Sequence, residues 1–90
     1  MRMDLYKIEF KQSAERDIRE ITPALIPNIL KRIGTLAINP FPRQSLKLSG
    51  VEVTYRLRIG NYRVIYEVDP GAKTIIVHYV RHRREVYRKL

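Results

Sequence analysis

The chain has 90 residues, enough for one small hydrophobic core, so we expect a single domain over residues 1–90. It contains no cysteine, which excludes disulfides and thiolate metal sites, and no run of roughly 18 apolar residues, so we expect a cytoplasmic protein with no membrane partner. The 18 Lys and Arg residues outnumber the 9 Asp and Glu residues, and the net charge of +9 predicts an anionic partner such as nucleic acid or an acidic protein.

The N-terminal part of the chain predicts a strand and then a short amphipathic helix. Residues 3–10 alternate between apolar and polar side chains, as in a strand with one buried face. Ser13 is the expected N-cap of a helix that ends near Ile21. The charged residues of this helix are expected to fill its solvent-facing side: Glu15, Arg16, Asp17, Arg19 and Glu20.

A second helix is predicted between Thr22 and Ala37, where apolar residues form a continuous stripe. Pro23 suits the first position of a helix. Pro27, however, would clash with the carbonyl four residues back in a helix that starts at Pro23. The regular helix is therefore expected to begin near Pro27, after an irregular turn.

The most informative stretch is Tyr55–Val68, YRLRIGNYRVIYEV. It alternates on both sides of a central Gly-Asn pair, which predicts a β-hairpin closed by a type I′ or related two-residue turn. The register then pairs Arg58 with Arg63 and places Arg56 on the same face, opposite the apolar one. Like charges directly across a hairpin destabilise it, so we expect this exposed face to bind an anion.

The remaining segments complete the predicted sheet. Residues 45–50 are expected to be briefly extended, and residues 73–80, KTIIVHYV, predict an interior strand because both faces are largely apolar. The last ten residues are too polar for a core strand and predict a loop or short helical turn. The order of elements predicts an α+β fold: an N-terminal strand, a helical hairpin and a three-stranded antiparallel meander, forming one small sheet with the helices on one face.

The residue types suit phosphate chemistry without a cofactor. We find no phosphate-binding glycine motif, no nucleophile elbow and no metal-ligand spacing, so we expect no metal. Arginine offers a permanently charged fork of donors that matches phosphate oxygens. Tyr87 and His82 are the candidates for proton transfer, whereas His78 is interpreted as structural. These groups suffice for RNA cleavage in which the substrate's own 2′-OH attacks the neighbouring phosphorus.

The chain resembles the RelE/ParE toxins of prokaryotic type II toxin-antitoxin systems, and within them the RelE-like branch. The resemblance is carried by KLSG at residues 47–50, by the hairpin and by HRREVYR at residues 82–88. It implies a ribosome-dependent mRNA endoribonuclease that cuts in the decoding site and inhibits translation. It also implies an acidic RelB-like antitoxin as partner and allows a toxin-antitoxin heterotetramer.

The resemblance assigns roles to individual residues. The implied catalytic residues are Arg56, Arg58, Arg63, Arg83 and Tyr87, with His82 as a second candidate for proton transfer. Arg63 would contact the scissile phosphate, Arg83 would assist the leaving group, and Tyr87 would act as base or orient the nucleophile. The implied RNA-binding residues are Lys47, Arg81, Arg84 and Arg88.

Two alternatives are weighed against this function. A ParE-type inhibitor of DNA gyrase shares the fold but lacks the full set of nuclease residues. A noncatalytic module would use the same basic face to bind RNA or an acidic protein. Retention of the arginine and tyrosine residues favours the RelE-like nuclease.

Overall fold

The computed structural model describes residues 5–42, 45–47 and 54–82. In this part of the chain one five-stranded sheet has the order β1-β5-β4-β3-β2. Its strands are β1 (Lys7–Phe10), β2 (Ser45–Lys47), β3 (Thr54–Ile59), β4 (Tyr62–Asp69) and β5 (Thr74–His82). The helical elements between β1 and β2 are α1 (Gln12–Arg19), the 3₁₀ turn η1 (Pro23–Leu25), α2 (Ile26–Gly34) and the 3₁₀ turn η2 (Thr35–Ala37).

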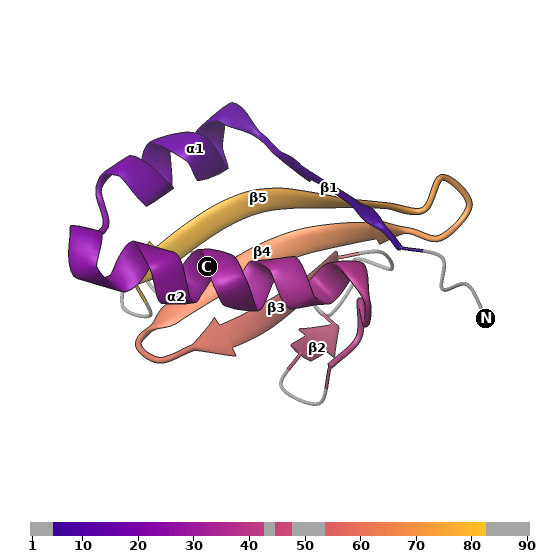
Figure 1. The fold of residues 1–90 in the computed structure, drawn as a ribbon. Coiled ribbons are helices and arrows are strands. Elements are labelled where there is room, and N and C mark those ends of the chain that lie inside the picture. The colour runs from indigo at the N-terminus through magenta and orange to yellow at the C-terminus, as the bar shows by residue number, and fades with distance from the viewer. Residues whose placement is uncertain (1–4, 43–44, 48–53, 83–90) are drawn as a thin grey trace.

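Figure 1 shows α1 and α2 on the same side of the sheet, which confirms the predicted α+β arrangement. The strands β2 to β5 pair antiparallel with their neighbours, whereas β1 pairs parallel with β5. The N-terminal strand therefore lies beside the last strand, and β5 is an interior strand as expected. None of the helices described here is long and apolar enough to cross a membrane.

The hydrophobic core lies between the helices and one face of the sheet. Alternate residues of β3, β4 and β5 point into it, together with the apolar stripe of the helical elements. Among its largest fully buried side chains is Tyr66, whose hydroxyl donates a 2.7 Å hydrogen bond to the carbonyl of Pro40. This bond ties the loop after η2 to the centre of the sheet.

The hairpin register is as predicted, with Arg58 opposite Arg63 and Tyr55 opposite Tyr66. Gly60 has a φ of 58°, and no other residue of this turn has a positive φ. Glycine at the first central position alone is the pattern of a type II′ turn rather than a type I′ turn. Both turns match the twist of the flanking strands, so the register is the same for either.

The helices begin somewhat differently from the prediction. The first runs from Gln12 with Lys11 as its N-cap residue, so the expected capping role of Ser13 is wrong. Its hydroxyl instead donates to the carbonyl of His78, because α1 lies against β5. The irregular turn before the second helix is confirmed as η1, and the regular helix begins at Ile26, one residue before Pro27. At that early position proline removes no intrahelical hydrogen bond.

Strand β5 extends to His82, so the expectation that the chain leaves the sheet at Arg81 is wrong. Arg81 pairs with Arg63 of β4, and His82 pairs with Tyr62. A register shift also lies within β5: Ile65 pairs with Tyr79 but Tyr66 pairs with Val77, which leaves one extra residue in β5. Such a bulge reverses which side of the sheet the following residues face.

Candidate nucleic-acid interface

A row of arginines crosses three strands on the sheet face that points away from the helices. Arg58 of β3 pairs with Arg63 of β4, and Arg63 pairs in turn with Arg81 of β5. Neighbouring strands lie about 4.8 Å apart, so the row spans roughly 10 Å. Arg56 lies on the same face, two residues before Arg58 on β3. We call Arg58, Arg63 and Arg81 the arginine row.

The three guanidinium groups of the hairpin differ in exposure. Arg58 is exposed and Arg56 is partly buried, in line with an open basic face. Arg63 retains only 5% of its accessible surface, so the expectation that all three would be exposed is wrong for this residue. Packing immobilises its side chain, which reduces the conformational entropy that Arg63 can lose when it binds a ligand.

Asp17 of α1 holds the third member of the arginine row. Its Oδ2 atom accepts hydrogen bonds from Arg81 Nε at 3.2 Å and from the backbone N–H of Val80 at 3.0 Å. Only 20% of the Arg81 side chain and 14% of the Asp17 side chain are exposed. The expectation that Asp17 faces solvent is therefore wrong, and Arg81 is a held arginine rather than a free surface cation.

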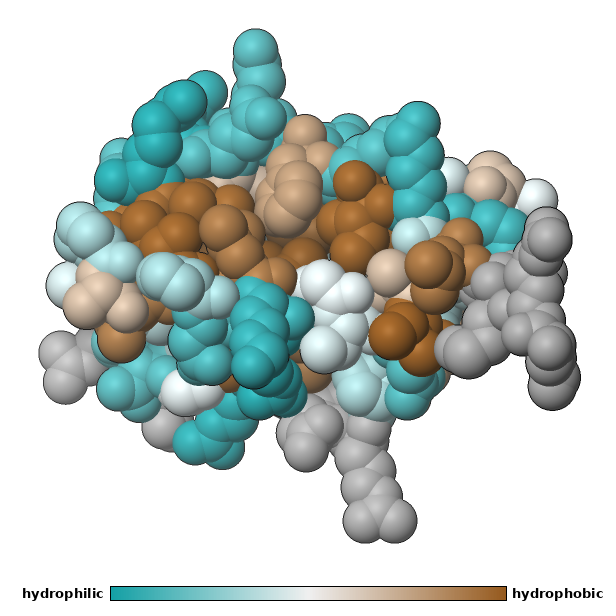
Figure 2. Space-filling model, viewed as in Figure 1, coloured by the Kyte–Doolittle hydropathy of each residue, from teal (hydrophilic) through white to brown (hydrophobic). Residues whose placement is uncertain are grey.

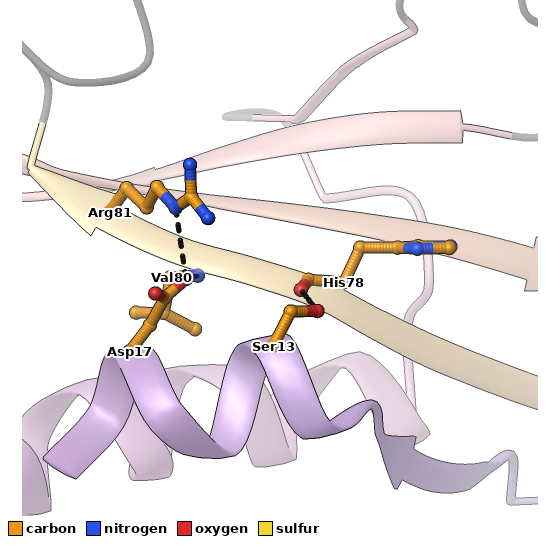
Figure 3. A network of polar contacts seen from close by, with 5 residues as sticks. All are labelled: Ser13, Asp17, His78, Val80 and Arg81. Atoms are coloured by element: carbon orange, nitrogen blue, oxygen red, sulfur yellow. Dashed lines mark hydrogen bonds and ion pairs between the residues drawn. The ribbon is translucent and has the colours of Figure 1, made fainter. Parts of the chain in front are cut away.

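Helix α1 closes the edge of β5 where β1 no longer covers it. The pairing of β1 ends at Val77, and beyond this point Ser13 and Asp17 contact β5 instead (Figure 3). The Ser13 hydroxyl donates to the carbonyl of His78 at 2.6 Å, and Asp17 accepts from Val80. Because these two helix residues are four apart, both side chains lie on the face of α1 that meets the strand.

An aromatic side chain lies beside the arginine row. Tyr79 follows the bulge, points to the same side as Arg81 and is 39% exposed. The guanidinium carbon of Arg81 lies 4.3 Å from the centre of its ring, which is close enough for a cation–π interaction. Nearby, Nε2 of His78 lies 3.1 Å from Oε1 of Glu67, consistent with its structural interpretation.

His82 lies on the helix side of the sheet, away from the arginine row. It pairs with Tyr62, and the two rings meet edge to face with centroids 5.5 Å apart. Both rings line a pocket of about 360 Å³ next to the hairpin turn, together with Leu25, Asn28 and Ile29 of the helical layer. His82 therefore lies on the side of the sheet opposite Arg58 and Arg63, although it lines a small cavity of about 80 Å³ together with Arg81 and Asp17.

Of the remaining predicted site residues, only Lys47 lies within the described chain. Lys47 lies in β2 opposite Tyr55. Arg83, Arg84, Tyr87 and Arg88 lie outside the described residues. No three His, Asp or Glu side chains in the described chain are grouped to hold a metal ion.

Sequence reasoning missed Asp17 and Tyr79 as parts of this face. The spacing of Ser13 and Asp17 placed them on one side of a helix, but nothing in the sequence placed that side against β5. Simple alternation along β5 from Ile75 would have put Tyr79 in the core. Only the bulge, which no residue type in the strand marks, turns Tyr79 and Arg81 outward.

Comparison with known proteins agrees with this fold. Residues 8–87 match the family model of the ParE toxin of the type II toxin-antitoxin system parDE. The putative toxin RelE1 of Methanocaldococcus jannaschii is 28% identical over 92% of this chain and 96% of its own. Toxin RelG of Mycobacterium tuberculosis is 26% identical over 93% of this chain and 98% of its own.

Solved structures give the same result. The toxin-antitoxin complex RelBE2 of Mycobacterium tuberculosis superposes with a TM-score of 0.77 at 27% identity, over 88% of this chain and 99% of that chain. The RelE-RelB complex of Pyrococcus horikoshii also gives a TM-score of 0.77 at 27% identity, over 88% of this chain and 96% of that one. The chain thus belongs to the ParE toxin family of type II toxin-antitoxin systems and is a RelE-like toxin.

Proposed function

We propose that this toxin is a metal-independent endoribonuclease that cleaves mRNA in the ribosomal decoding site, acts in the cytoplasm and is neutralised by an acidic RelB-like antitoxin. The observation that carries the proposal is the arginine row on the open face of a RelE-like sheet. The three arginines lie on adjacent strands whose backbones span roughly 10 Å, and their positive charges match the negative charge of one or two phosphates. This surface would stabilise the charge that develops on a phosphate during cleavage.

In the proposed reaction, the 2′-OH of one nucleotide attacks its own 3′-phosphorus and displaces the 5′-oxygen of the next nucleotide. Arg63, which packing holds in place, would contact the scissile phosphate. Arg56 and Arg58 would add positive charge, since arginine is a poor general base. A DNA substrate would not react, because it lacks the attacking hydroxyl.

Proton transfer falls to the C-terminal segment. Of the two candidates, His82 faces the helices, so Tyr87 is the better candidate for the base or the group that orients the 2′-OH. Arg83 would assist the leaving group by stabilising the charge on the leaving oxygen. These two roles rest on the resemblance to the family.

An antitoxin partner is supported by those solved RelE-like relatives that are complexes with RelB. The helix side of this toxin carries an apolar band between α1 and α2 (Figure 2). Phe10, Ile18 and Leu30 line a shallow hollow of about 340 Å³ there, and Leu30 is 40% exposed. We assign this band to an amphipathic antitoxin helix and the arginine row to an acidic antitoxin segment.

The decisive experiment maps cleavage of mRNA on programmed ribosomes by primer extension. The wild-type toxin should cut within the codon in the decoding site. Arg58→Ala and Tyr87→Phe should each slow cleavage by at least tenfold, the usual scale for losing one electrostatic or proton-transfer contribution. Lys31→Ala removes an exposed cation from α2 and is the matched control, which should cut at the wild-type rate.

A second function is favoured by the family model itself, which describes a ParE toxin. A ParE-type protein would leave the message intact and block supercoiling by DNA gyrase. Purified gyrase and relaxed plasmid, tested with the same four proteins, therefore separate the two functions. Intact mRNA together with blocked supercoiling would replace the nuclease proposal with gyrase inhibition.

A further inference from the structure

The exposed aromatic ring on the basic face is unexplained by packing alone. Tyr79 is 39% exposed. By contrast, the adjacent residues Val64 of β4 and Val80 of β5, which point to the helix side of the sheet, are fully buried. Tyr79 pairs with Ile65 of β4 and lies two residues before Arg81 on β5, so it is next to the arginine row on the same face. Along a strand this separation is about 6.6 Å, so the ring and the guanidinium groups lie within the reach of a single nucleotide.

The ring is also part of a preorganised arrangement. The Asp17 carboxylate fixes Nε of Arg81 at 3.2 Å, and the guanidinium carbon of Arg81 in turn lies 4.3 Å from the centre of the Tyr79 ring. Helix α1 therefore positions Arg81 through Asp17 (Figure 3), and Arg81 in turn lies against the ring of Tyr79. Groups held in this way lose little freedom when a ligand arrives.

We propose that Tyr79 and Arg81 form a stacking platform for one unpaired base of an RNA whose phosphate contacts the arginine row. Unpaired RNA bases stack on tyrosine rings and on arginine planes, and each such contact contributes about 1–3 kcal/mol. The platform would fix the position of one base relative to the phosphate held by Arg63. The proposal rests on the proposed function, since it requires that the basic face binds RNA.

The test measures binding of short, non-cleavable 2′-O-methyl RNA by fluorescence anisotropy at low salt. One oligonucleotide carries every base, and others lack a single base at each position in turn. Removing the stacked base should weaken binding to the wild-type toxin by roughly 5- to 100-fold. Tyr79→Phe keeps the ring and should reproduce this loss.

Tyr79→Leu keeps apolar bulk but removes the ring. It should weaken binding of the complete oligonucleotide by a similar factor and should bind the complete and abasic oligonucleotides equally well. If Tyr79→Leu weakens binding of the complete and abasic oligonucleotides by the same factor, or weakens binding of neither, the stacking platform is refuted. Thermal melting of each variant separates a loss of binding from a loss of folding.

Arg58→Ala distinguishes this proposal from the function on which it rests. It should weaken the complete and abasic oligonucleotides by the same factor, because its contact is with phosphate. If Arg58→Ala has no effect on either, the basic face is not the RNA site, and both proposals fail. If Arg58→Ala weakens binding of both oligonucleotides while Tyr79→Leu weakens both by the same factor or weakens neither, only the stacking platform fails.

Discussion

Replacing Asp17 is the most direct test of how α1 holds the end of β5. Asp17→Ala leaves the N–H of Val80 without its acceptor, at a cost of about 1–3 kcal/mol. It also removes the partner of Arg81. Breaking a fully buried pair costs about 3–5 kcal/mol, but these side chains are 14% and 20% exposed, so we expect a further 1–2 kcal/mol. The total is about 2–5 kcal/mol.

For a domain of this size such a loss lowers Tm by roughly 8–40 °C, and urea denaturation would detect it as a lower midpoint. Asp17→Asn keeps an oxygen that can accept from Val80 and should cost only about 1–2 kcal/mol. Glu15→Gln changes an exposed acid on the same helix and should cost less than about 1 kcal/mol. The difference in unfolding free energy between Asp17→Asn and Glu15→Gln therefore measures the contribution of the ion pair.

A double-mutant cycle of Asp17→Asn and Arg81→Met measures the coupling between the two side chains. We expect about 1–2 kcal/mol, above the range for exposed surface pairs. Hydrogen exchange at the Val80 amide should also accelerate in Asp17→Ala. A coupling energy near zero, together with an unchanged Val80 exchange rate, would refute the conclusion that α1 closes this edge.

Three further predictions follow from local geometry. Tyr66→Phe leaves the carbonyl of Pro40 without its donor and should cost about 1–2 kcal/mol, seen as a lower urea midpoint with an unchanged slope. Gly60→Ala places a side chain at a φ of 58° and should cost about 1 kcal/mol in thermal denaturation, whereas equal stability would contradict the type II′ turn. Arg58→Thr removes a like-charge partner of Arg63 and should stabilise the fold by about 0.2–1 kcal/mol, while the salt dependence of antitoxin binding becomes shallower. Loss of both stability and binding in this variant would show that the pair is not repulsive.

The hairpin and the division of its residues between two faces could be predicted from local sequence pattern alone. Period-two alternation around Gly60 is enough to fix the register, because a two-residue turn permits only one pairing. Arg56, Arg58 and Arg63 were therefore assigned to one face correctly. The burial of Arg63 could not be predicted, since it depends on side chains brought in from other parts of the chain.

The arrangement around β5, by contrast, depends on contacts between distant parts of the chain. The parallel pairing of β1 with β5 joins the two ends of the described chain, and it stops at Val77, where α1 takes over the edge. At the same place a bulge reverses the alternation, so Arg81 joins the arginine row and His82 turns to the helices. A contact between residues more than sixty positions apart and a one-residue shift in pairing leave no periodic trace in the sequence. These features nevertheless decide which side chains lie on the same face as the arginine row.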